Sequence, residues 1–333
     1  MYGFYKVKFL DAKSCGRDRL GGKPRICQLA LSARMAITGA CRRQFQGSSM
    51  AISNLLPNSV AVVTGGASGI GLAAAKRFAQ MGLTVCIADI GADRLAAAAA
   101  EIAAVAPGGA NAVMASEADV SRVEDLQHLE TTVRERFGGT DILMNNAGIQ
   151  PGSAVFGPAK NWQRVMDVNL WGVINGTQIF TPGMIGRDRP GLVINTGSKQ
   201  GITTPPGDPA YNVAKTGVKA FTEALQHELR NTPNCRLSAH LLIPGFVFTG
   251  LTAYGRTEKP SAAWTSEQTV DFMLERLVHG DFYILCPDND VPRTLDEKRI
   301  AWAAGDLIEN RPPLSRWHPD YKAAFEGFIR ATK

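Results

Sequence analysis

The chain has 333 residues, and 36 Lys and Arg residues against 30 Asp and Glu residues give it a formal net charge of +6. Apolar residues make up 45% of the sequence and charged residues 20%, close to the globular average, which excludes wholesale disorder and a collagen-like chain. The sequence contains no run of about 18 apolar residues, so we expect no membrane-spanning helix.

The positive charge is concentrated in residues 1–49, which hold ten basic and two acidic residues and so carry a net charge of +8. The remainder of the chain carries a net charge of −2. Because the part that we expect to fold is slightly acidic, we predict no nucleic-acid partner. We interpret 1–49 as a disordered basic leader outside the folded domain.

Three interpretations of this leader stay open. One is that translation begins at Met50, just before the first strand pattern, so that 1–49 is a misassigned extension. Another is a targeting segment, because the arginines, serines and few acids fit a mitochondrial transit peptide better than a secretory signal. The third is a functional arm. We expect a cytoplasmic protein, or a mitochondrial matrix protein if the leader is a transit peptide.

None of the six cysteines forms a CxxC pair or a cluster with histidine. Those that follow the leader, Cys86, Cys235 and Cys286, are predicted to be small buried thiols in a reducing compartment. We expect no metal site, because no cluster of His, Cys and carboxylates resembles one and the five histidines are isolated from one another in the sequence.

From Met50 onward, apolar runs of strand length alternate with amphipathic stretches of helix length. The predicted strands are Val60–Thr64, Thr84–Asp89, Ala112–Ser116, Ile142–Asn145, Leu192–Thr196, Arg236–Ile243 and Phe282–Cys286. The predicted helices are Ile70–Met81, Arg94–Ala104, Val123–Phe137, Trp162–Phe180, Tyr211–Arg230 and Ser266–Val278.

This alternation predicts an α/β fold, with a single Rossmann-like, doubly wound domain at 50–290 and a mostly parallel seven-stranded sheet. Continuous Val, Ile and Leu runs are typical of strands that are covered on both faces. Residues 291–333 are predicted to form a helical extension, with helices at Leu295–Asn310 and Tyr321–Ile329. We expect it to pack on the domain; covering the active-site mouth or a subunit interface is the alternative.

The first strand runs directly into a glycine-rich turn at Thr64–Gly71 and then into a helix. In such an arrangement Gly65 permits the tight turn, Gly69 allows the backbone to approach a pyrophosphate, and Gly71 allows close helix–strand packing. The helix N-terminus offers unpaired N–H groups and a positive dipole to the phosphates. The motif predicts a bound dinucleotide, although an ordinary turn is the alternative.

Asp89 ends the second strand, 18 residues after Gly71. A carboxylate at this place can accept hydrogen bonds from both ribose hydroxyls of NAD and would repel the 2′-phosphate of NADP. No Lys or Arg stands at Ser68 or Ile90 to offset that repulsion, and we expect Arg94 to point along the following helix. The alternative for Asp89 is a helix cap or a solvated acid.

Tyr211 and Lys215 lie four residues apart, hence on one face of a helix, and Ser198 precedes them by 13 residues, just after an apolar strand. A phenol needs nearby positive charge to act as a base near neutral pH, and Lys215 with an oxidised nicotinamide would supply it. Ser198 is placed to hydrogen-bond the substrate oxygen as its charge changes.

Taken in order, the motifs resemble those of the short-chain dehydrogenase/reductase family over some 190 residues, from Val60 to about Thr249. They are Thr64–Gly71, Asp89, Asp119-Val120, Asn145-Asn146-Ala147-Gly148, Asn169, Ser198, Tyr211-xxx-Lys215 and Pro244-Gly245-Phe246-Val247-Phe248-Thr249.

The resemblance implies four catalytic residues: Tyr211 as the general acid/base, Ser198, Lys215, and Asn169, which bends its helix and holds a water in the proton relay. It implies NAD as the cofactor and a set of residues that bind it: Gly65, Ser68, Gly69, Ile70, Gly71, Asp89, Asp119, Val120, Asn146, Ala147, Gly148, Tyr211, Lys215, Pro244, Gly245, Val247 and Thr249. For Asp119, turn chemistry is an alternative to a place beside the adenine, and Asn145 is more typical of a structural residue.

The segment after Thr249 corresponds to the substrate lid of this family. It is apolar and aromatic, which favours a hydrophobic alcohol or ketone as substrate, although packing of the lid on the domain explains the pattern equally well; its residues are Phe246, Phe248, Leu251, Tyr254 and Trp264. The sequence therefore predicts an NAD-dependent oxidoreductase that interconverts a hydrophobic secondary alcohol and its ketone. The alternatives are an NADPH-dependent carbonyl or 3-oxoacyl reductase and a non-catalytic dinucleotide sensor.

The resemblance also implies a homotetramer or homodimer. Ala214, Val218, Phe221 and Leu225 recur at the spacing of one apolar helical face, which we expect either to form the subunit interface or to pack on the sheet.

Overall fold

The computed structural model describes residues 58–331. The leader 1–49 and its three interpretations lie outside the described residues, as does Met50. Within 58–331, no helix is long and apolar enough to cross a membrane.

A seven-stranded sheet forms the centre of the described chain, with the order β3-β2-β1-β4-β5-β6-β7, and each of its strand pairings is parallel. The strands are β1 (Val60–Thr64), β2 (Thr84–Asp89), β3 (Val113–Glu117), β4 (Ile142–Asn145), β5 (Gly191–Thr196), β6 (Leu237–Ile243) and β7 (Tyr283–Leu285). The predicted Rossmann-like sheet is therefore confirmed. The order reverses between β1 and β4, and ligands of doubly wound sheets bind at the carboxyl ends of the strands there.

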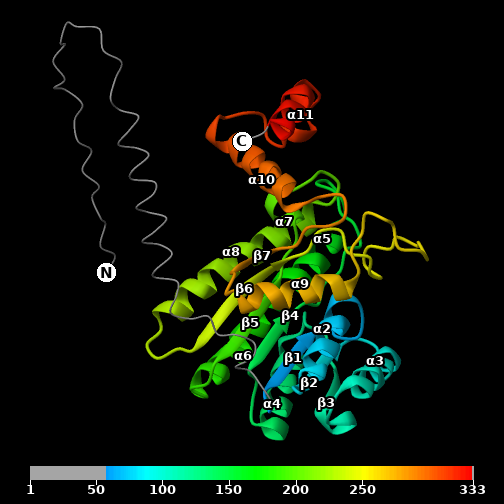
Figure 1. Cartoon of the computed structure of the whole chain (residues 1–333), viewed down its shortest axis with the longest axis vertical. Helices are drawn as coiled ribbons and strands as arrows, with labels where there is room; N and C mark the ends of the chain where they lie inside the picture. The colour runs from blue at the N-terminus through cyan, green and yellow to red at the C-terminus, as the bar shows by residue number, and fades with distance from the viewer. Residues whose placement is uncertain (1–57, 332–333) are drawn as a thin grey trace, which may run out of the picture. The chain divides into compact units, whose positions relative to one another are not determined.

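Helices cover both faces of the sheet (Figure 1). They are α2 (Gly69–Gln80), α3 (Ala92–Val105), α4 (Val123–Phe137), α5 (Ala159–Met166), α6 (Gly172–Gly186), α7 (Gln200–Thr203), α8 (Pro209–Asn231) and α9 (Ser266–Val278). Along β1, Ala61 and Val63 pack with α2, α3 and α9, whereas Val60 and Val62 pack with α4, α6 and α8. This alternation explains why the strand is apolar at each of its first four positions, Val60 to Val63.

The predicted helix Trp162–Phe180 is in fact three segments. The π-helical turn η3 (Asp167–Trp171) separates α5 from α6, and it contains Asn169. A π-turn inserts an extra residue into the helical ladder, which periodicity alone does not reveal, and such turns are frequent at functional sites.

The last segments of the chain form a small helical unit with its own aromatic cluster. It contains α10 (Arg293–Ile308), η4 (Ser315–Trp317), η5 (Pro319–Tyr321) and α11 (Lys322–Arg330). Trp302 is buried, its indole N–H donates to Ser315 Oγ (2.8 Å), and the rings of Phe325 and Phe328 meet it edge-on. The guanidinium of Arg311 lies 4.1 Å from the Trp302 ring centroid.

The apolar stripe on α8 packs inside the chain. Ala214 and Val218 are fully buried, and Phe221 and Leu225 pack against the core clusters beside the sheet. Val218 and Phe221 pack with strands β6 and β7, whereas Ala214 packs against α5, so packing on the sheet holds for part of the stripe and the subunit interface stays a prediction.

Candidate active site

The loop between β1 and α2 forms a tight cradle. Gly65 and Gly69 have φ values of +64° and +55°, which L side chains rarely adopt, and a Cβ on Gly71 would lie 2.2 Å from the carbonyl oxygen of Gly65. Ser68 is the N-cap of α2, yet its side chain makes no capping hydrogen bond. The first N–H groups of this helix therefore have no side-chain cap, an arrangement that suits a phosphate.

A large open cavity of about 1240 Å³ runs along the carboxyl ends of the strands. Of the residues predicted for the site, only Gly71 and Asn169 do not line it, because the first packs beneath the glycine loop and the second is fully buried. The predicted residues that line it are Gly65, Ser68, Gly69, Ile70, Asp89, Asp119, Val120, Asn146, Ala147, Gly148, Ser198, Tyr211, Lys215, Pro244, Gly245, Val247 and Thr249.

Asp89 lies at one end of this cavity, beside the glycine loop. Its Oδ2 accepts a hydrogen bond from the backbone N–H of Ala67 (3.0 Å), and its Oδ1 accepts one from that of Ile90 (2.8 Å). The expected direction of Arg94 is wrong: its guanidinium turns back to Asp89 Oδ1 (3.3 Å) and to the Ile90 carbonyl (2.8 Å), and it lines the cavity. The Arg94 side chain turns back because the Asp89 carboxylate and the Ile90 carbonyl oxygen both accept hydrogen bonds from its guanidinium.

Asp119 and Val120 follow β3 on the same side of the cavity. The Asp119 side chain accepts hydrogen bonds from the backbone N–H (2.9 Å) and the hydroxyl (2.7 Å) of Ser121, so it stabilises the turn. Val120 is 6% exposed, and a Cβ on Gly172 would lie 2.8 Å from Val120 Cγ2. The turn places this pair at the cavity wall.

Asn146 joins the glycine loop to the segment after β4. Its amide group donates to the carbonyl oxygens of Thr64 (3.2 Å) and Gly65 (3.3 Å). The Thr64 hydroxyl accepts from the backbone N–H groups of Asn146 (3.0 Å) and Ala147 (3.2 Å). These bonds hold two walls of the cavity at a set distance.

Tyr211, Ser198 and Lys215 come together at the other end of the cavity. The Ser198 side chain is close enough to the Tyr211 hydroxyl to lower its pKa. Lys215 Nζ lies 5.7 Å from the Tyr211 ring centroid and donates to the Thr196 carbonyl (2.8 Å). Ser198 follows the end of β5, and Tyr211 and Lys215 lie on α8. This helix starts at Pro209, whose ring fixes φ at a helical value.

Burial dominates the electrostatics of this group. It raises the pKa of Tyr211 to about 12, with the hydrogen bond from Ser198 acting in the opposite direction, and it lowers the pKa of Lys215 to about 8. The depressed phenol pKa that base chemistry needs is therefore not supplied by the surrounding residues of this chain.

Asn169 lies behind these residues and is fully buried. Its amide group donates to the Ile149 carbonyl, and its Oδ1 accepts from the Ile149 N–H, both at 2.8 Å. A Cβ on Gly148 would lie 3.4 Å from Asn169 Oδ1 and 3.9 Å from Lys215 Nζ, so the asparagine and the lysine flank one stretch of backbone. Asn169 thus clamps the segment that faces Tyr211.

The aromatic lid residues divide between the cavity and the core. Phe246, Leu251 and Tyr254 line the cavity, whereas Phe248 and Trp264 do not; Trp264 meets Phe272 edge-on and packs against the core. Packing on the domain therefore holds for Trp264, while the three lining residues leave the hydrophobic substrate a prediction.

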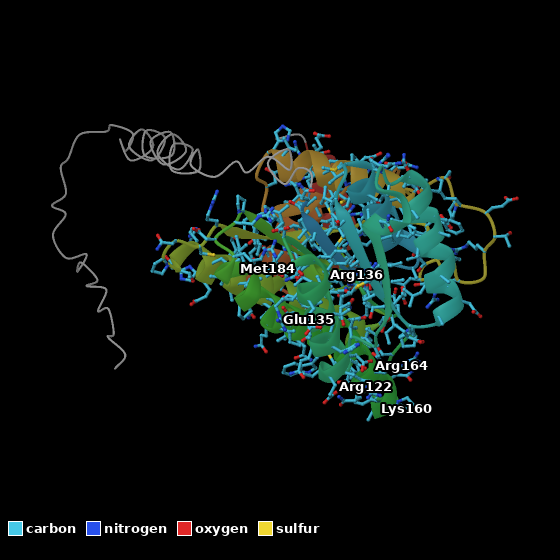
Figure 2. The ribbon with its side chains drawn as sticks, turned by 90° about the horizontal axis from the view of Figure 1, so that it is seen from below. Arg122, Glu135, Arg136, Lys160, Arg164 and Met184 are labelled. Carbon is cyan, nitrogen blue, oxygen red and sulfur yellow. The ribbon has the colours of Figure 1, made fainter. Side chains whose placement is uncertain are left out.

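Several cavity residues were missed by sequence reasoning: Arg94, Gln150, Lys160, Arg164, Lys199, Gln200 and Arg256. Lys160 and Arg164 lie one turn apart on α5, at the lower end of the view in Figure 2. Surface Lys, Arg and Gln carry no distinctive spacing, so only the position of Lys199 directly after Ser198 was a usable signal.

The family model of the short chain dehydrogenases matches residues 59–260. The chain is 33% identical to a 1-deoxy-11-beta-hydroxypentalenate dehydrogenase from Streptomyces exfoliatus, over 79% of this chain and 95% of the relative. Among solved structures it resembles a short chain dehydrogenase/reductase from Burkholderia phymatum in complex with NAD (28% identity, TM-score 0.69, 78% of this chain and 97% of that one).

A further solved neighbour is an actinorhodin polyketide ketoreductase with NADPH, with 27% identity, a TM-score of 0.59, and coverage of 66% of this chain and 90% of the neighbour. The matched residues include the whole sheet up to β6 and the Ser198, Tyr211 and Lys215 group. The chain therefore belongs to the short-chain dehydrogenase/reductase family, and it is an oxidoreductase that acts on alcohol or ketone groups.

Proposed function

We propose that the protein is an NAD-dependent oxidoreductase that interconverts a hydrophobic secondary alcohol and its ketone, with Tyr211 as the general acid/base. The observation that carries this proposal is that Ser198, Tyr211 and Lys215 line the same cavity as Asp89, with the Lys215 ammonium 5.7 Å from the centroid of the Tyr211 ring. A dinucleotide that lies along this cavity would reach both groups.

The residues present fit such a dinucleotide. The uncapped start of α2 and the tight glycine cradle would hold the pyrophosphate, and Asp89 would accept hydrogen bonds from the adenosine ribose. Val120 would border the adenine. Lys215 would hold the nicotinamide ribose, and Thr249 would contact the carboxamide.

When bound, NAD⁺ supplies the hydride acceptor and a positive charge near the phenol. For alcohol oxidation, Tyr211 must lose its proton and then accept the proton of the substrate hydroxyl. Because burial raises its pKa to about 12 and the surrounding residues of this chain do not bring it back down, the positive charge of the oxidised nicotinamide would have to add to that of Lys215 to lower it. Ser198 would donate a hydrogen bond to the substrate oxygen.

The substrate class follows from the lid. Phe246, Leu251 and Tyr254 give the cavity an apolar wall next to the Tyr211 group, which favours a hydrophobic substrate. The Streptomyces relative, whose name describes a hydroxyl group oxidised on a pentalenate, is consistent with a hydrophobic secondary alcohol.

The second candidate is an NADPH-dependent carbonyl or 3-oxoacyl reductase. The observation that favours it is Arg94, a cation within reach of Asp89 that could meet a 2′-phosphate. A solved neighbour with NADPH shows that this family includes such enzymes. A non-catalytic sensor is disfavoured, because all four catalytic positions keep the residues that the chemistry needs. We further propose that the protein is a homodimer or homotetramer, located in the cytoplasm or, if 1–49 is a transit peptide, in the mitochondrial matrix.

A panel of hydrophobic secondary alcohols, assayed with NAD⁺ and with NADP⁺ at the nicotinamide absorbance, tests the proposal. We expect turnover with NAD⁺ and little with NADP⁺. Turnover only with NADP⁺ would favour the second candidate, and cofactor binding without turnover of any alcohol or ketone would favour the sensor.

A further inference from the structure

A buried ionic cluster adjoins the chemical end of the cavity. The ammonium of Lys199 lies 2.7 Å from Asp296 Oδ2 and 3.3 Å from Asp288 Oδ2. The two carboxylate side chains are 5% and 7% exposed, and the lysine side chain is 18% exposed. Ion pairs this deep lose much solvation, so removing one partner leaves the other charge uncompensated.

The cluster joins segments that are distant in sequence. Lys199 directly follows Ser198 and precedes α7, Asp288 lies in the loop after β7, and Asp296 lies in the first turn of α10. Arg299 and Arg316 face the same place, where they and the Lys199–Asp296 pair border a small cavity of about 40 Å³. With Lys199, the two arginines give this cluster three cations against two carboxylates.

The cluster also touches the backbone that borders the active site. Asp288 Oδ2 accepts a hydrogen bond from the Phe246 N–H (3.2 Å), and the Lys199 N–H donates to the Pro244 carbonyl (3.3 Å). A Cβ on Gly245 would lie 2.6 Å from Asp288 Oδ2 and 2.8 Å from Lys199 Nζ. The segment Pro244-Gly245-Phe246 is therefore seated directly against the ion pair.

A second contact leads from Lys199 to the catalytic helix. A Cβ on Gly201, in the short helix that starts after Lys199, would lie 2.5 Å from the carbonyl carbon of Lys215. Because the two backbones are in close contact, a displacement of α7 would also displace α8.

We propose that Lys199 is a positioning residue, and that with Asp288 and Asp296 it makes helix α10 a support for the nicotinamide-and-substrate end of the cavity. The glycine cradle and Asp89, at the other end, do not touch the cluster. The consequence is that the C-terminal helical unit sets the geometry of the chemistry while leaving the adenosine end unchanged. This inference rests on the proposed binding of NAD.

The test compares Asp296→Asn and Lys199→Met with wild type by calorimetric titration of NAD⁺ and of ADP-ribose, which lacks the nicotinamide. We expect each variant to weaken NAD⁺ binding at least about tenfold while ADP-ribose binding stays within about twofold. With any alcohol that the wild type oxidises, kcat should fall more than KM rises. Lys199→Arg, which keeps the charge, should recover most of the NAD⁺ affinity.

Glu297→Gln is the matched control, because this carboxylate is also on α10 but is exposed and pairs with Arg293. It should change neither ligand's affinity. Equal weakening of both ligands by Asp296→Asn, or no effect on either, would overturn the proposal.

If wild type binds neither ligand, the proposed function fails, and hydrogen exchange then decides the positioning role. Faster exchange at residues 198–203 and 244–248 in Asp296→Asn than in Glu297→Gln would support it; equal exchange would overturn it.

Discussion

At the scale of single residues, we expect cofactor choice to depend on the pair formed by Asp89 and Arg94. The carboxylate would repel a 2′-phosphate, whereas the guanidinium, 3.3 Å away and half exposed, would attract one if it were free of the aspartate. In wild type the carboxylate pairs with its neighbour and already accepts three hydrogen bonds, from Ala67, Ile90 and Arg94, so about one of its roughly four acceptor positions stays open for a ribose hydroxyl.

We therefore expect wild type to prefer NAD over NADP by at least about tenfold in kcat/KM, which corresponds to about 1.4 kcal/mol. Asp89→Ala should narrow or invert this ratio because it frees Arg94, and adding Ile90→Arg should extend the effect. Steady-state kinetics with both cofactors measure the ratio. The control is Asp89→Ala combined with Arg94→Ala, which should lose the gain with NADP; equal use of both cofactors by wild type would contradict the role of Asp89.

Substitution of Tyr211 tests its proposed role as the general acid/base. Tyr211→Phe keeps the buried ring and removes only the hydroxyl, so NAD binding should change little while turnover falls by about 10²–10⁴-fold. Calorimetry gives the affinity and the absorbance assay gives the rate. A variant that retains more than half of the wild-type rate would show that another group transfers the proton.

At the scale of elements, helix α6 lies unusually close to strand β4. The Asn145 amide on β4 donates to the hydroxyl of Thr177 (3.1 Å) and to Asn195 on β5 (2.9 Å), and Asn195 donates to Thr222 on α8 (3.0 Å). This polar ladder fits only because position 176 is a glycine: a Cβ there would lie 2.4 Å from Asn145 Oδ1.

Gly176→Ala should destabilise the protein by about 1–3 kcal/mol, because overpacking outweighs the gain in helix propensity. Gly183→Ala on the same helix meets only an ordinary contact of 3.5 Å and should be neutral or stabilising by up to about 1 kcal/mol. Urea unfolding of both variants measures the difference. If the two substitutions changed stability equally, the contact between a Cβ at position 176 and Asn145 would be relieved by a small shift that costs no free energy.

At the scale of the whole molecule, burying Lys215 makes stability depend on pH. The pKa of this ammonium is about 8 in the folded protein, against an ordinary value of 10.5. Between these values the unfolded chain binds more protons than the folded one, so stability rises with pH across this window. Below pH 8 the folded protein carries the full cost of a buried charge.

We expect the free energy of unfolding of ligand-free wild type to rise by roughly 3 kcal/mol relative to Lys215→Met between pH 8 and 10.5. Taking the difference between the two proteins removes the opposite contributions of Tyr211, Cys86 and Cys286, whose pKa values burial raises to about 12. Denaturant unfolding at several pH values gives this difference. Parallel stability curves would show that Lys215 titrates normally.

The leader gives a second prediction at this scale. Since β1 starts at Val60, a chain that begins at Met50 should fold and keep its turnover and NAD affinity. Expression of this shortened chain beside the full one checks it. Loss of cofactor binding in a folded shortened chain would mean that 1–49 is a functional arm.

Most of the fold was predicted from the local pattern of apolar, polar and turn residues along the sequence. The apolar runs of β1, β2 and β4 have the predicted bounds, and α4 and α9 begin and end at the predicted residues, because periodicity and turn residues act within a few residues. The ordered motifs likewise predicted many of the residues that line the cavity, since a glycine loop and a strand-end aspartate are recognisable from their spacing along the chain.

Tertiary structure decided what depends on partners far away in sequence. The π-turn at Asn169, the direction of Arg94, the inward packing of the α8 stripe and the Lys199–Asp296 pair arise from contacts between separate elements. A single sequence shows which side chains are charged or apolar. The partner that each side chain contacts is set by how the helices and strands pack together. The packing energy depends on residues that lie far apart in the sequence, so no short stretch of it contains all the partners.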